Sequence, residues 1–92
     1  MSLPILIDSV SAAAIQANES FILDVANGLI SQCGEEAPDL TEPIQDHLNA
    51  VTLANELMFA HEAPNIADQT LFQAARQLKL YHLYQLNELI SA

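Results

Sequence analysis

The stretch ARQLKLYHLYQLNELI, residues 75–90, decides the fold. It contains no proline or glycine, and its leucines follow the spacing of an amphipathic helix. It also holds the only two basic residues of the chain, Arg76 and Lys79. Apolar side chains lie on more than one side of the predicted helix. One apolar stripe is enough to close a small helical domain, so the second side predicts contact with a neighbouring subunit.

The composition of the whole chain supports the same expectation. Its 92 residues predict a single helical domain over residues 1–92, near the lower size limit for burying a core unaided. Apolar residues make up 51% of the chain, and charged residues only 15%, against the usual quarter. A small monomer needs more polar surface than a large one. We therefore expect part of the apolar surplus to be buried between subunits.

The charge balance excludes several classes of partner. A net charge of −10 argues against nucleic acid and against anionic lipid, since both require clusters of Lys and Arg. Cys33 is the single cysteine, so no internal disulfide can form. The start MSLPILIDSV lacks the basic residues of a signal peptide, and no stretch reaches the roughly 18 apolar residues of a membrane span. These features predict a cytoplasmic protein without membrane contact in its resting state.

Prolines and glycines divide the chain into three predicted helices, which pack as a hairpin or bundle within an oligomer. After an extended start at residues 3–7, they cover about residues 9–33, 40–60 and 65–90. Candidate signals at the helix ends are Asp8 or Ser9 and Gly34 for the first helix, Asp39 with Glu42 or Thr41 with Pro43 for the second, and Asn65 with Asp68 for the third.

Helical spacing also predicts which residues face the core. The main stripe of the last helix is centred on Leu71, Ala75, Leu78 and Leu89, with Phe72, Leu83, Leu86 and Ile90 on its flanks. Leu80 and Tyr84 stand on the far side. Single exposed apolar residues are common, so simple exposure is the alternative explanation for that far side. The side chains that we expect at an interface between subunits are Phe21, Leu80, Tyr81 and Tyr84.

No pattern of a catalytic, metal or cofactor site is present, and we expect the protein not to be an enzyme. Cys33 precedes two glutamates, which disfavour a reactive thiolate. His47, His61 and His82 are too widely spaced for two of them to share one helical face as ligands. The acidic run of residues 35–42 lacks the central glycine of a calcium loop.

His82 lies in the middle of the apolar stripe of the last helix. A histidine at such a position is most often neutral and hydrogen-bonded. The functional alternative is a proton sensor, because burial disfavours the charged imidazolium and acid would place a cation in an apolar seam. Acid also neutralises carboxylates and relieves repulsion between subunits that each carry ten negative charges.

Two segments resemble the RebB-like proteins of the R-body, or "killing trait", family. LIDSVSAAAIQAN, residues 6–18, is similar to their opening, where a short Asp-Ala/Ser-Val-Thr/Ser stretch leads into an alanine-rich helix. LFQAARQLKLYHLYQLN, residues 71–87, resembles their last helix, in which a Leu-x-Gln-Ala-Ala element precedes a tyrosine at about the position of Tyr84. Residues 34–43 and 61–65 depart from the family pattern, because prolines and acids interrupt a helix rich in glutamine and alanine.

The resemblance implies a bacterial cytoplasmic protein that polymerises, with related small subunits, into a rolled ribbon that unrolls in acid. It implies no catalytic residue. The predicted function is therefore a structural, self-assembling subunit of a homo- or hetero-polymer. The alternative from the residues themselves is a small acidic helical adaptor or regulator that binds a protein partner as a dimer.

Overall fold

The computed structural model describes residues 8–62 and 66–91, and this part of the chain contains helices and no strands. The all-α class is confirmed. The prediction of three helices is wrong, because the described residues form four: α1 (Ser9–Ala17), α2 (Glu19–Cys33), α3 (Pro38–Ala60) and α4 (Ile66–Ser91).

The extra break lies at Asn18, inside the helix predicted over residues 9–33. Asn18 leaves the helical conformation, with φ −105° and ψ 9°. Its side-chain Nδ2 donates to the carbonyl oxygen of Ala14 at 2.9 Å, and its backbone N–H donates to both Ala14 and Ile15. An asparagine side chain that bonds to nearby backbone offers the chain an alternative to a continuous helix. The chain therefore turns between α1 and α2.

The start of α1 follows the predicted cap. The Oδ1 atom of Asp8 accepts from the backbone N–H of Ser11 at 2.8 Å, and Oδ2 accepts from its hydroxyl at 3.0 Å. These bonds, the backbone one first, hold the pKa of Asp8 below its usual value, because they favour the ionised carboxylate. The capping prediction for Asp8 is confirmed.

The connection between α2 and α3 differs from its prediction. Gly34 follows α2 as expected, but α3 begins at Pro38 after Ala37, and Pro43 lies inside the helix. Thr41 does not cap the helix, since its hydroxyl donates to the carbonyl oxygens of Ala37 and Gly34. Proline suits the first turn because the N–H that it lacks has no partner there. The predicted signals Asn65 and residues 3–7 lie outside the described residues.

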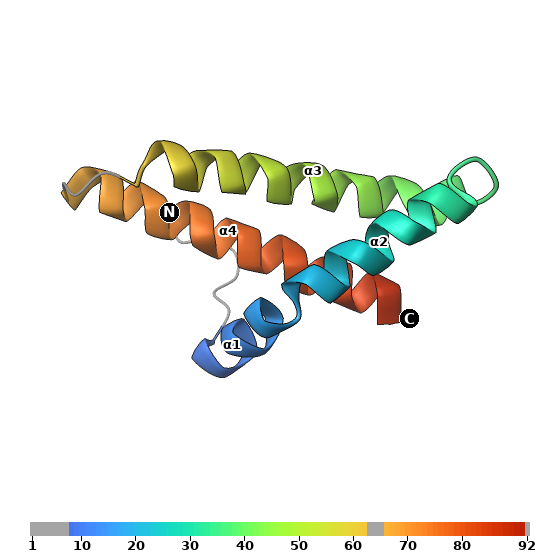
Figure 1. Cartoon of the computed structure of the whole chain (residues 1–92), viewed down its shortest axis with the longest axis horizontal. Coiled ribbons are helices and arrows are strands. Elements are labelled where there is room, and N and C mark those ends of the chain that lie inside the picture. The colour runs from blue at the N-terminus through green and yellow to red at the C-terminus, as the bar shows by residue number, and fades with distance from the viewer. Residues whose placement is uncertain (1–7, 63–65, 92) are drawn as a thin grey trace.

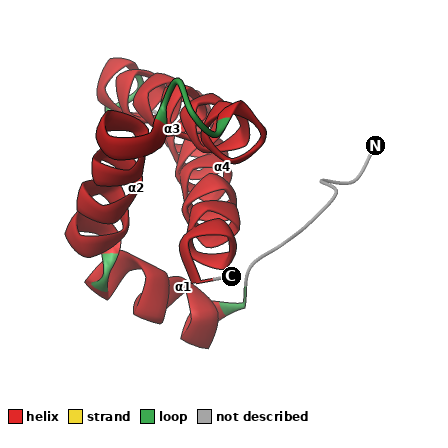
Figure 2. Cartoon of the chain, turned by 90° about the vertical axis from the view of Figure 1, so that its right-hand side faces the viewer, coloured by secondary structure: helices red, strands yellow, loops and turns green. Residues whose placement is uncertain are grey.

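The four helices are arranged around one long hairpin. Helices α3 and α4 run antiparallel, α2 lies against both of them, and α1 crosses near the start of α2 (Figure 1). The view in Figure 2 shows α2, α3 and α4 around a common centre. The first residue of α2 is tied to α4 by an ion pair between Glu19 and Lys79, with Oε2 and Nζ 3.0 Å apart.

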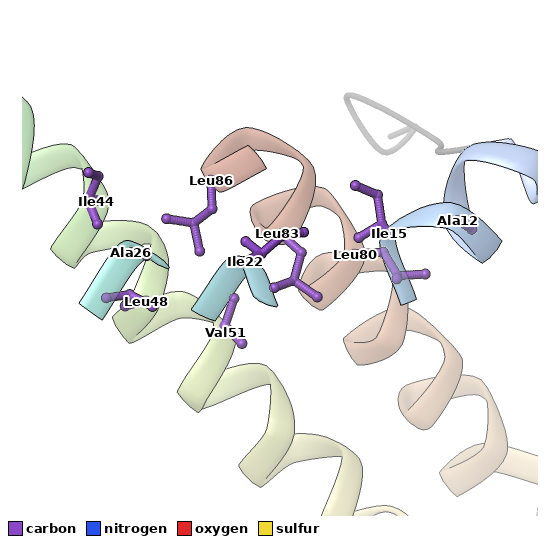
Figure 3. Packing of buried hydrophobic residues seen from close by; sticks show 10 residues of the cluster. All are labelled: Ala12, Ile15, Ile22, Ala26, Ile44, Leu48, Val51, Leu80, Leu83 and Leu86. Atoms are coloured by element: carbon purple, nitrogen blue, oxygen red, sulfur yellow. The ribbon is translucent and has the colours of Figure 1, made fainter. Parts of the chain in front are cut away.

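The core lies between α2 and one face of the hairpin, which we call the covered face (Figure 3). From the hairpin it contains Ile44, Leu48 and Val51 of α3 and Leu80, Leu83 and Leu86 of α4. Ile22 and Ala26 of α2 and Ala12 and Ile15 of α1 pack against them. Leu80 is only 1% exposed, so the expectation that it lacks a partner within the chain is wrong.

Candidate functional site

Helix length leaves part of the hairpin without a cover. At a rise of 1.5 Å per residue, α2 is about 22 Å long, whereas α3 is about 35 Å and α4 about 39 Å. Since α2 lies over the C-terminal half of α4, the end of the hairpin near the α3–α4 connection extends beyond it (Figure 1).

A groove between α3 and α4 opens at this uncovered end. It has a volume of about 290 Å³. We call it the open groove, and its lining residues are Leu57, His61, Leu71, Ala74, Ala75 and Leu78. Leu57, Leu71 and Leu78 are 37%, 49% and 38% exposed, although leucine at a helix–helix contact is normally buried. Leu53, one turn before Leu57, is also exposed and extends the apolar surface along α3.

The open groove is free of formal charge in an otherwise strongly acidic chain. None of its six lining residues is a carboxylate, lysine or arginine, and His61 is the single titratable group among them. Twelve Asp and Glu residues therefore lie elsewhere in the sequence. A groove of this composition favours an apolar ligand surface over a basic one.

A second uncovered apolar surface lies along one side of α2. Phe21, Val25 and Gly28 are spaced by four and three residues and so share a side, which we call the α2 strip. Phe21 is 64% exposed. A Cβ atom added to Gly28 would meet nothing within 4 Å, so no contact with residues 8–62 or 66–91 accounts for glycine in this helix. Glycine in a helix interior costs about 0.5–1 kcal/mol relative to alanine.

The hairpin also brings together two histidines that are 35 residues apart in sequence. The Nδ1 atoms of His47 on α3 and His82 on α4 lie 2.8 Å apart, at hydrogen-bond distance. The two ring centroids are 5.1 Å apart, with 47° between the ring planes, and the ring of Tyr81 meets His82 edge-on. At neutral pH one imidazole donates its Nδ1–H and the other accepts, so the bond requires at least one neutral ring.

The environment of His82 opposes its protonation. Burial first, and then the positive charge of His47, lower the pKa of His82 below the usual value of 6.5. One added proton still leaves a donor and an acceptor within the pair. Two protons leave two donors that face each other, and the bond is then lost.

The predicted site residues are distributed over several environments. Phe21 is exposed on α2, Leu80 is in the core, Tyr81 is half-buried beside His82, and Tyr84 is 38% exposed. The structure brings His82 to His47 but does not gather the four predicted interface residues into one surface. The open groove instead contains Leu71 and Leu78, which the spacing placed at the centre of the buried stripe.

Two features were not identified from the sequence: the partner of His82 and the open groove. His47 was not recognised as the partner of His82 because only spacings of three or four residues were considered. In an antiparallel hairpin, residues that lie opposite each other have sequence numbers with a constant sum. Placing His47 opposite His82 also places Leu57 opposite Phe72, one residue from Leu71. Once the histidine pair fixes the register, this rule also locates the lining of the open groove.

Within residues 8–62 and 66–91, no three His, Cys, Asp or Glu side chains are grouped in a way that could hold a metal ion. Over the same residues, no helix has the length and apolar character needed to cross a membrane. No protein-family profile, characterised protein or solved structure matches this chain.

Proposed function

We propose that this protein is a structural subunit that assembles with copies of itself. The observation that carries the proposal is the amount of apolar surface left outside the core. At least eight large apolar side chains are more than a third exposed in the described part of the chain: Val10, Phe21, Leu53, Leu57, Phe59, Leu71, Leu78 and Tyr84. Singly exposed apolar residues need no explanation, but a chain with 15% charged residues that leaves a leucine-lined groove open does.

The resemblance to R-body proteins supports a ribbon as the form of this assembly, with related small subunits as further partners. The charges allow such packing where the surfaces are neutral. The lining of the open groove lacks carboxylates and the side of α2 with Phe21 has one, Asp24, so like-charged copies can approach there with little repulsion.

Electron microscopy of the purified protein in negative stain, at neutral pH and after acidification, tests this function. Ribbons, sheets or filaments at neutral pH are the expected result, and a change of their shape in acid would support a ribbon of the R-body type. Uniform particles of the size of one chain at both pH values would contradict the proposal.

The second candidate is an acidic helical adaptor that binds a basic partner. Exposed Glu35, Glu36 and Asp39 at the connection of α2 and α3 favour it, because they concentrate negative charge at one end of the molecule. An adaptor would form a discrete dimer with a defined partner instead of an open-ended polymer.

A further inference from the structure

From the two uncovered apolar surfaces we propose how one copy contacts the next: the α2 strip of one copy docks into the open groove of a second copy. This inference rests on the proposed self-association and names the two surfaces that carry it. The partner at each surface is another copy of this chain.

One surface projects a side chain and the other is a recessed space. Phe21 is a large side chain that projects from α2 with most of its surface free, and the open groove is a concave space of about 290 Å³ lined by leucine and alanine. Gly28 lies on the same side of α2, two turns after Phe21, and has open space around it. A glycine there lets the backbone of α2 approach a neighbouring helix closely, and none of the described residues occupies that space.

The charges select a second copy over a basic partner. Each copy carries a net charge of −10, so two copies repel wherever their carboxylates face each other. The open groove is without Asp, Glu, Lys and Arg, and the side of α2 that carries the strip has one carboxylate, the exposed Asp24 between Phe21 and Gly28. A basic partner would gain no ion pair from the groove lining, and that lining adds no carboxylate to oppose Asp24 when the strip of an acidic copy approaches.

The positions of the two surfaces determine the form of the assembly. The strip belongs to α2, which packs on the covered face, and it shares no residue with the open groove on α3 and α4. A contact between two different surfaces is heterologous, so each copy keeps one free strip or one free groove after it has bound a neighbour. Such a contact produces an open chain of copies, unless its rotation closes a ring.

Two single substitutions separate the surfaces. Phe21→Ser removes the strip's main side chain, and Ala74→Glu places a carboxylate in the groove at an exposed position. Val10→Ser and Gln73→Glu are the matched controls, since they make the same kind of change at exposed positions outside both surfaces. Circular dichroism verifies that helix content is retained, and Leu71→Gln serves as a second groove variant if Ala74→Glu changes it.

Sedimentation velocity over a range of concentrations is the measurement. We expect the wild type and both controls to grow with concentration, and the Phe21→Ser and Ala74→Glu variants to remain single chains. An equimolar mixture of these two variants joins the intact groove of one to the intact strip of the other, so it forms a species of twice the chain mass and no larger one.

Other results of these experiments would contradict the pairing of strip with groove. Growth of either variant at the wild-type concentration dependence, or a mixture that stays monomeric, overturns the pairing of strip with groove. A wild-type dimer that Phe21→Ser leaves intact overturns it too, while the proposed self-association stands. A wild type that is monomeric at every concentration overturns both.

Discussion

The part of the α3–α4 hairpin under α2 and its uncovered end are built from the same residue types but differ in burial. On the covered face, Leu83 and Leu86 are fully buried beneath α2. At the uncovered end of the hairpin, Leu71 and Leu78 of the same helix line the open groove and are 49% and 38% exposed. The difference comes from whether α2 covers that part of the hairpin and not from the hydrophobicity of the residues. An apolar stripe therefore identifies a surface that needs a partner without saying whether the partner is in the same chain.

The largest expected change in stability comes from truncating one leucine under α2, compared with one leucine of the open groove. Leu83→Ala should lower the free energy of unfolding by about 2–5 kcal/mol, since it opens a cavity in the core. Leu78→Ala should lower it by no more than about 1 kcal/mol, because this side chain is already partly exposed. Urea unfolding followed by circular dichroism, with Ala74→Glu as the background that keeps the chain monomeric, measures both. An equal loss in the free energy of unfolding for the two variants would contradict the difference in burial between Leu83 and Leu78.

The pattern of the sequence identified both apolar sides of α4 but centred the core incorrectly. Leu83 and Leu86, which are buried, were predicted only as flanks of the main stripe. The predicted stripe contained Leu71 and Leu78, whereas Leu80 was assigned to the far side. Which side is buried depends on where α2 lies, and the position of α2 depends on the turn at Asn18. A single asparagine inside a helical pattern is a weak signal, because its effect depends on whether its side chain finds a nearby carbonyl.

The candidate site was less predictable than the fold. Helical class, the cap at Asp8 and the central position of His82 follow from local residue patterns. The pairing of His82 with His47 requires the register of two helices, which local patterns do not contain. Phe21 was predicted at an interface between subunits, and within the single chain it is 64% exposed.

The histidine pair gives a smaller effect that depends on pH. A lowered pKa for His82 means that the unfolded chain binds a proton more readily than the folded one, so stability is full above pH 6.5 and declines as the pH falls below 6.5. The hydrogen bond to His47 contributes about 0.5–1.5 kcal/mol while it is intact. Urea midpoints measured between pH 8 and pH 5 should therefore decrease.

Variants assign this pH dependence to the pair. His82→Gln and His47→Gln should each flatten the decrease, whereas His61→Gln, which changes a histidine outside the pair, should retain it. Carboxylates of the acidic chain shift stability in the opposite direction as they are neutralised, and this background is common to all three variants. A decrease of the same size in every variant would remove the pair as its cause.

Gly28 is expected to separate the needs of the single chain from those of the assembly. Gly28→Ala should raise the stability of the monomer by about 0.5–1 kcal/mol, because alanine is the better helix former and nothing lies within 4 Å of the added Cβ. The same methyl group should weaken assembly, since it separates the α2 strip from the neighbouring copy. Urea unfolding and sedimentation velocity measure the two effects. A variant that is more stable and assembles as well as the wild type would show that close approach at Gly28 is not required.

The smallest effect concerns the ion pair that ties α2 to the covered face. Replacing Lys79 with Gln removes the bond to Glu19, and ion pairs near a protein surface contribute only about 0.2–1 kcal/mol. The loss should diminish as salt concentration rises, because ions screen the attraction. Urea unfolding at low and high salt measures it, and Glu19→Gln is the matched change on the other partner. If the pair helps to position α2, both variants should also reduce assembly slightly, since the α2 strip begins two residues after Glu19. Unchanged assembly with reduced stability would show that the packing of Ile22 and Ala26 positions the helix without the ion pair.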